Sequence, residues 1–502
     1  MYTFERKVQT LTENSLASAM LSAKGLQISE EQRARLDKIQ SDWQFYEGYH
    51  WQGISDTDKP QVTKNYIRKF VDKFVAFEFR KGFILNMKPE IEQITENNPK
   101  EFISNVWDDN GKFAKLTEIG ISKSITGDAW IQPYFEPKYI NGKRNPDFDD
   151  PYDLYEKGRI RIFVLHPSIC FPEYEEGTDK DKLVKFTIMY PIKVNDSLLG
   201  MNRFRETIRK IVWTKDRVQE FVGDKKISDL PNKYGTLTFV QMRNLPMTGS
   251  SYGQNDIDDI IPLNVELNLK TSDISEIIDY HSAPITLVFG ARLGNLDRGA
   301  NKVWGGLPKD AKVENLKLEG NLEAAASYLT DLKTAMHEIG GIPVGALGGE
   351  LKISNTSGIA LEIAMLPLLE RIDIKQNCSA EALQKINSLI LLIGEKEGMI
   401  KVPPGIKRAD FFYNEVSFED ALPKDAVREL QQIESEMVLG LEDREGAMER
   451  LGRENIPTKI ARIDADRKAN PEVYGTKTPG KNAEGGRKKL NAGDLNSPEP
   501  QE

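Results

Sequence analysis

Cysteine and histidine are scarce in this chain, and their scarcity limits the chemistry that it can carry out. Its 502 residues include two cysteines, Cys170 and Cys378, and four histidines. The cysteines lie far apart, each beside apolar neighbours, which is typical of small buried thiols rather than of a disulfide. The histidines lack the spacing of a zinc site, so we predict no bound metal.

The motif of ATP hydrolysis is missing as well. No G-x-x-x-x-G-K-[ST] sequence occurs to hold phosphate and magnesium. The glycines between Gly340 and Gly349 follow a predicted helix, whereas a dinucleotide-binding fingerprint follows a strand. We therefore expect no catalytic residues, no cofactor and no enzymatic activity.

Long apolar runs are also absent. No stretch reaches the roughly 18 uninterrupted apolar residues that a membrane span needs. The segment from Met1 to Thr10 lacks the apolar run of a secretory signal. We expect a protein that stays in the cytoplasm and does not contact a membrane.

Positive charge is not in excess. Lysine and arginine total 68 against 77 aspartates and glutamates, and 68 − 77 gives a net charge of −9. This balance argues against tight, sequence-specific DNA binding. It does not exclude DNA that slides past, because an acidic lining would repel phosphates evenly.

Two polar groups are candidates for a chemical site. The cluster Asp256, Asp258 and Asp259 could bind a divalent cation. Acidic residues also favour helix N-termini, and we interpret the cluster as a helix cap. The pair His337-Glu338 lies at a predicted helix end, and we interpret it as surface or interface packing.

The first half of the chain is predicted to combine helices with antiparallel strands. Ser29 should cap one amphipathic helix, and a second runs from Asn65 to about Phe79, since apolar residues recur every three or four positions. Alternating apolar residues predict strands between Arg159 and Gln241. Because helices do not alternate with these strands, the fold class is α+β. Further elements are expected at 99–107 and 113–126 (helices) and at 129–135, 160–165, 184–190, 207–214, 218–222 and 236–241 (strands).

The second half is predicted to be mainly helical. A helix capped by Asp256 and a helix at 322–339 should flank a strand at 285–289 and a loop at 290–320. A glycine-rich loop, 342–358, precedes the longest helix, 359–394, which Pro367 should kink because proline removes a backbone donor. A strand at 410–417, a charged helical region at 424–467 and a disordered tail at 470–502 complete the chain.

This order of elements resembles the portal (head-to-tail connector) proteins of tailed bacteriophages, of the siphophage type, over most of residues 60–470. Three stretches carry the resemblance. They are Asn65 through Lys73, the run from Gln241 to Leu263 with Asn244 and Gly253, and Met437 to Gly452. None of them is a catalytic signature, so the resemblance depends on their order.

The resemblance implies a portal fold with named parts. These are a mixed N-terminal wing (1–256), two stem helices (257–283 and 321–341), a small β-containing clip (284–320), a tunnel loop (342–358), a long kinked wing helix with a strand (359–418), a helical crown (419–469) and the disordered tail (470–502). The tunnel loop would face the DNA channel with Gly345, Gly348, Gly349, Glu350, Lys352 and Asn355, and Pro367 would be the helix kink.

The resemblance also implies a function. The chain would form a dodecameric ring at one capsid vertex, assembled in the cytoplasm of the bacterial host, as a passive channel for packaging and ejection of double-stranded DNA. Its partners would be its own copies, the DNA, the terminase large subunit, the major capsid and scaffolding proteins, and a head-completion adaptor. Two alternatives are another virion ring or adaptor protein, which is usually shorter, and an enzyme built on the Asp256 cluster or on His337-Glu338.

Overall fold

A computed structural model describes residues 28–51, 60–146, 148–151, 153–175, 182–195, 204–282, 286–289, 310, 312–315, 322–347, 358–419, 426–451 and 456–469. The chain divides into two compact units, Met1–Ala421 and Leu422–Glu502, and each is described by itself. Helices and strands both contribute, which is compatible with the predicted α+β class.

The N-terminal helices begin and end where local chemistry dictates. Ser29 and Gln32 form a capping box at the start of α3 (Glu30–Glu47), which ends at Gly48 in the left-handed conformation. The Asn65 side chain caps α4 (Tyr66–Phe79) by accepting a hydrogen bond from the Arg68 backbone N–H. These predicted starts are confirmed. The neighbouring helices are α5 (Pro89–Glu92), α6 (Pro99–Asp109) and α7 (Lys112–Thr126).

All strand pairs of the two larger sheets are antiparallel, as predicted. One sheet has the order β11-β2-β5 and the other the order β10-β9-β8-β7-β6. The predicted strand at 236–241 is wrong at its start, because β11 begins only at Val240. The strands are β2 (Asp128–Pro137), β5 (Gly158–Leu165), β6 (Cys170–Tyr174), β7 (Leu183–Asn195), β8 (Phe204–Thr214), β9 (Arg217–Val222), β10 (Lys225–Pro231) and β11 (Val240–Arg243), with a small β3 (Tyr139–Ile140) and β4 (Lys143–Arg144) pair.

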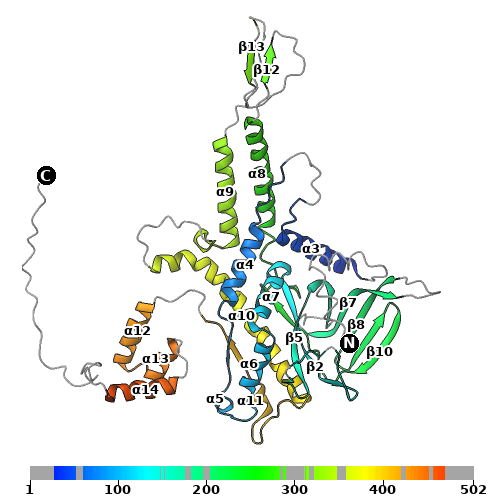
Figure 1. Ribbon diagram of the computed structural model, residues 1–502, viewed down its shortest axis with the longest axis vertical. Helices are drawn as coiled ribbons and strands as arrows, with labels where there is room; N and C mark the ends of the chain where they lie inside the picture. The colour runs from blue at the N-terminus through cyan, green and yellow to red at the C-terminus, as the bar shows by residue number, and fades with distance from the viewer. Residues whose placement is uncertain are drawn as a thin grey trace, which may run out of the picture. The chain divides into compact units, whose positions relative to one another are not determined.

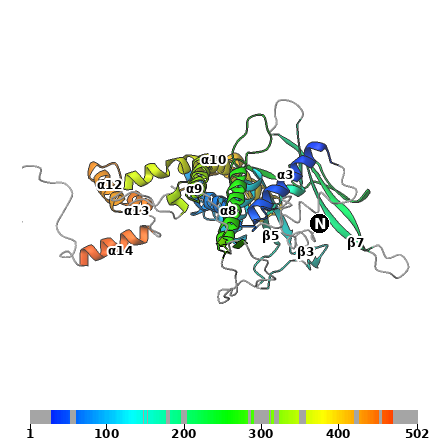
Figure 2. The ribbon, with the colours of Figure 1, turned by 90° about the horizontal axis from the view of Figure 1, so that it is seen from above.

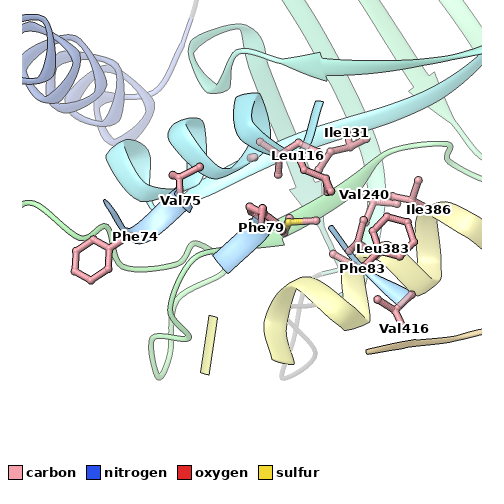
Figure 3. Packing of buried hydrophobic residues seen from close by; sticks show 14 of the residues in the cluster. Phe74, Val75, Phe79, Phe83, Leu116, Ile131, Val240, Leu383, Ile386 and Val416 are labelled. Carbon is pink, nitrogen blue, oxygen red and sulfur yellow. The ribbon is translucent and has the colours of Figure 1, made fainter. Parts of the chain in front are cut away.

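The largest core lies where α4, α7 and α10 (Gly358–Lys396) meet the three-stranded sheet. Figure 3 shows Phe79 and Leu116 from α4 and α7 close to Ile131 and Val240 of the sheet, and Leu383 and Ile386 of α10 beside Phe83. A second core surrounds Trp130, whose ring packs on Phe186. Burial of these large side chains supplies most of the stabilising free energy.

The middle of the chain forms a pair of helices around a small sheet. In Figure 1 and Figure 2, α8 (Ile261–Ser282) and α9 (Leu322–Gly340) lie side by side. Between them in sequence, β12 (Thr286–Phe289) pairs with β13 (Lys312–Asn315) in antiparallel register. A short 3₁₀ turn, η2 (Val344–Leu347), follows α9.

The strand predicted at 410–417 is wrong in its first part. Residues Arg408–Phe412 form α11, because Phe411 turns into the core, and only Glu415–Ser417 form a strand, β14, paired with β1 (Ile84–Asn86). In the second unit, α12 (Ala426–Leu439), α13 (Arg444–Arg450) and α14 (Ile456–Ala469) confirm a small helical region. Pro457 lies in the first turn of α14, where proline is tolerated. None of the described helices is both long and apolar enough to cross a membrane.

Candidate channel-forming segments

The two helices predicted to flank the small sheet are present, with one boundary corrected. The first was predicted to start directly after Asp256, but α8 starts at Ile261. Asp256 is therefore not the cap of α8. The Asp256 carboxylate instead accepts hydrogen bonds from the side chains of Arg371 and Lys375 on α10. The small sheet between the helices confirms the strand predicted at 285–289.

Three buried polar side chains attach α8 to the segment that precedes α4. Asn264, Asn268 and Ser272 recur every four residues, so they share one face of α8. Four residues of helix rise about 6 Å, which matches two residues of extended chain at about 6.6 Å. The three side chains accordingly accept hydrogen bonds from alternate backbone N–H groups: those of Tyr66 (2.9 Å), Lys64 (2.9 Å) and Val62 (3.1 Å).

The attachment continues to α3 through a histidine. Asn264 also donates to the Lys64 carbonyl (2.9 Å), and the Asn268 amide lies 2.7 Å from Nδ1 of His50. The other ring nitrogen of His50 lies 2.8 Å from the Phe45 carbonyl, to which it donates. Burial lowers the pKa of His50, so the ring is neutral and can accept from the amide. We call Asn264, Asn268 and Ser272 the amide ladder.

The end of α9 packs closely on α4. A Cβ atom at Gly340 would lie 2.3 Å from the Phe70 ring, so only glycine fits there. Next to it, Nδ1 of His337 donates to the Ile342 carbonyl (2.8 Å), and the His337 ring packs on Phe70. His337 therefore packs within the chain, against α4, rather than at the surface or at an interface as expected. The hydrogen bond from His337 therefore holds Ile342, the first residue of the segment 342–358, against the end of α9.

The predicted channel residues are placed only in part. Gly345 lies in η2, beside the buried Ala346. Pro367 lies in the first third of α10, and the kink there stays a prediction. The other predicted positions of the loop, Gly348, Gly349, Glu350, Lys352 and Asn355, lie outside the described residues, as does the tail at 470–502.

A buried cluster of five charged side chains joins the first half of α10 to α4, α7 and the turn before α8. Asp256 accepts from Lys375 (2.6 Å) and from Arg371 (2.9 Å). Lys123 pairs with Glu78, and Glu78 lies 3.8 Å from Lys375. We call these five residues the charge cluster. Its side chains are fully buried except for that of Arg371, which is 25% exposed.

The two carboxylates of the cluster balance its two fully buried lysines, and the third cation, Arg371, reaches partly into solvent. Burial alone would raise the pKa of Asp256, but Lys375 and Arg371 outweigh it and hold that pKa at about 2. Burial lowers the pKa of Lys123, while Glu78 opposes the change. The Phe74 ring lies 4.8 Å below the Lys375 ammonium, which adds a cation–π contact. Removing either carboxylate would therefore leave an uncompensated lysine charge in the core.

A second polar group holds α3 to the same turn. Lys38 donates to Asp258 (2.5 Å) and pairs with Asp42 (3.3 Å). The Asn255 amide donates to both carboxylates, at 2.7 Å to Asp258 and 3.2 Å to Asp42. Burial raises the pKa of Asp42 to about 7, against the opposing charge of Lys38. Asp256 and Asp258 thus take part in two separate structural contacts rather than in one cation site.

The backbone of the loop from β11 to α8 packs directly against the backbone at the end of α7. A Cβ at Gly253 would lie 2.4 Å from the Gly127 carbonyl oxygen, and the same oxygen accepts from the backbone N–H of Asn244 (2.8 Å). The close approach explains the glycine at 253, and the Asn244 side chain donates to the Gln254 carbonyl (3.1 Å). The stretch Gly249–Gly253 also reads G-x-S-x-G, a pattern that the sequence interpretation passed over. It lies in a loop, well separated from β11 and α8, and not on the sharp strand-to-helix turn that a serine nucleophile needs.

Two further observations bear on the enzyme alternative. Across the described ranges, no group of His, Cys, Asp and Glu side chains could hold a metal ion. A groove of about 1500 Å³ between β11 and α10 contains Cys378, but burial raises the pKa of that thiol, which disfavours the reactive thiolate.

The sequence interpretation missed the amide ladder and the charge cluster. Polar residues spaced by four on α8 could have indicated the ladder, since they interrupt an apolar face. The same spacing in Arg371, Lys375 and Ser379 could have indicated that this face of α10 meets buried carboxylates.

Comparison with known proteins identifies the family. A family model described as "Phage portal protein, SPP1 Gp6-like" matches residues 26–472. No curated protein matches the chain significantly. The matched residues include both flanking helices, the small sheet, the charge cluster and the helical second unit. Because this match covers most of its length, the chain belongs to the SPP1 Gp6-like family of phage portal proteins.

Proposed function

We propose that copies of this chain form a dodecameric ring at one vertex of a phage capsid, and that the ring is a passive channel for double-stranded DNA. Family membership makes the chain a virion component that serves DNA packaging and connects head to tail. In this proposal the chain performs no catalysis, and the packaging motor supplies the energy.

The observation that carries the proposal is the anchored helix pair. The amide ladder fixes α8, the close contact at Gly340 fixes α9, and the β12–β13 sheet lies between the two helices in sequence. A rigid pair of helices can present a small sheet to a docking partner without bending. We assign 257–283 and 321–341 as stem helices and 284–320 as the clip, which docks the terminase large subunit and later the head-completion adaptor.

The remaining parts follow from the same assignment. Residues 1–256 and 359–418 form the wing and 419–469 the crown. The wing contacts the major capsid and scaffolding proteins during assembly in the host cytoplasm. The loop 342–358 is the tunnel loop, with Glu350 and Lys352 as the charges nearest the DNA.

Deletion of the clip tests this function. Procapsids built with a chain that lacks 286–315 should contain the ring but package no DNA, because the motor has no docking site. Normal packaging by this variant would contradict the assignment. Within a complete ring, Lys352→Glu should lower the packaging yield, whereas an unchanged yield would remove Lys352 from the channel.

A further inference from the structure

We propose that neighbouring copies in the ring join head to tail through two specific faces: the exposed side of α10 in one copy and the basic side of α4, with its adjoining groove, in the next. This inference rests on the proposed ring and names the contact that builds it.

The first face lies on the first part of α10. Its side chains Ile363, Leu366 and Ile374 are 65%, 49% and 48% exposed. Glu370 and Asp373 are exposed between them, and these spacings of three and four residues place all five on one side of the helix. A row of large apolar residues with acidic neighbours is typical of a surface that a partner covers. In Figure 1 and Figure 2, this part of α10 extends away from the two larger sheets.

The second face combines basic charge with an apolar groove. Lys69, Lys73 and Arg80 lie along the side of α4 that is turned away from the core. A groove of about 550 Å³ adjoins it, lined mainly by apolar atoms of α3 and α7. The groove and the basic side are linked by Tyr46, whose hydroxyl donates to Asp72 of α4. The aromatic lining of the groove consists of Trp43, Tyr46 and Phe113.

The two faces point in opposite directions. Arg371 and Lys375 of α10 lie over the ring of Phe74 on α4, so each helix turns its buried side toward the other. Their exposed sides consequently point away from each other. A patch and its complement on opposite sides of one subunit form a heterologous contact, which closes into a ring when the rotation between copies is suitable.

The chemistry of the two faces is complementary. Glu370 and Asp373 carry negative charge where Lys69 and Lys73 carry positive charge, and none of the four takes part in an ion pair found among the described residues. The apolar side chains of α10, Ile374 among them, suit the groove between α3 and α7. A second copy of this chain therefore satisfies both faces at once, whereas DNA would satisfy only the basic one.

A charge exchange tests the contact in the full-length chain. The acidic face is reversed by Glu370→Lys with Asp373→Lys, and the basic face by Lys69→Glu with Lys73→Glu. Each reversal should weaken association of neighbouring copies roughly hundredfold, because like charges then oppose each other across the contact. The combined variant, with all four substitutions, should regain rings. Reversing Asp224 and Lys225, which are exposed on the β9–β10 turn, provides a control that should leave rings intact.

Native mass spectrometry reads the outcome, and circular dichroism checks that each variant is folded. Disulfide cross-linking tests the contact without reversing any charge. On oxidation, a chain with both Lys69→Cys and Glu370→Cys should give a ladder of cross-linked copies, whereas neither single variant should. Rings that persist in both reversed variants, without cross-linking, would overturn this contact and leave the portal function standing. A wild-type chain that forms no ring would overturn the proposed ring itself. Loss of DNA binding without loss of rings in the α4 variant would assign the basic face to DNA instead.

Discussion

Replacing Asp256 with asparagine removes the carboxylate that accepts hydrogen bonds from Lys375 and Arg371 in the core. The substitution keeps the shape of the side chain, so packing changes little. Lys375 then keeps a carboxylate oxygen of Glu78 at 3.8 Å, the Ser124 hydroxyl at 3.1 Å and the Phe74 ring at 4.8 Å. We therefore expect Asp256→Asn, which removes a single negative charge, to lower the free energy of unfolding substantially.

The magnitude follows from the burial of the pair. Breaking a buried ion pair by removing one partner costs roughly 3–5 kcal/mol. Arg371 is partly exposed and can turn toward water, so we expect a value near the lower end, about 3 kcal/mol. The lowering of the Asp256 pKa to about 2 from 3.8 corresponds to roughly 2–3 kcal/mol, which agrees.

Acid should reveal the same interaction in the wild-type chain. Because the folded pKa of Asp256 is below its unfolded value, the stabilisation is complete above about pH 4 and is lost as the pH falls toward about 2. The Asp256→Asn variant should lack this part of the acid response.

Urea unfolding followed by tryptophan fluorescence measures the loss, since Trp43, Trp107 and Trp130 are buried. Asp258→Asn is the matched control: its carboxylate is 38% exposed and pairs with Lys38, so it should cost less than about 1 kcal/mol. Adding Lys375→Met to Asp256→Asn should recover part of the loss. Equal destabilisation by the two asparagine variants would refute the role of the charge cluster.

Three further substitutions test other contacts. Asn268→Ala should cost roughly 1–3 kcal/mol, because the buried N–H of Lys64 loses its acceptor; a urea midpoint equal to wild type would remove the amide ladder as an anchor. Gly340→Ala should cost roughly 1–3 kcal/mol through the contact of its Cβ with Phe70, and a smaller side chain at Phe70 should restore part of the loss in thermal unfolding. The pKa of Asp42 is raised to about 7, so its contribution to stability is present below about pH 4 and is lost as the pH rises through 7. Asp42→Asn should therefore be more stable than wild type in urea unfolding at pH 8. An equal or lower stability of the variant at that pH would contradict this.

Local signals in the sequence were sufficient for elements whose ends are set by nearby residues. Ser29 and Asn65 predict helix starts because their side chains bond to amides three residues away. Strands with alternating apolar residues, such as β8, were also predictable. By contrast, β10 escaped prediction, since most of its side chains face water and show no apolar period.

The features that position the helix pair depend on contacts between distant residues. Asp256 resembles a helix cap locally, and its true partner, Lys375, is 119 positions away. Asn268 meets Lys64 across 204 positions. No window of sequence contains both partners of such a pair. The order of elements nevertheless identified the family, because it reflects the whole chain rather than any one contact.

The most direct test of the central claim is native mass spectrometry of the purified full-length chain. We predict closed rings of about twelve copies, with a central hole visible by negative-stain microscopy. A chain that stays monomeric or dimeric at all concentrations would contradict the proposal that it forms a DNA channel.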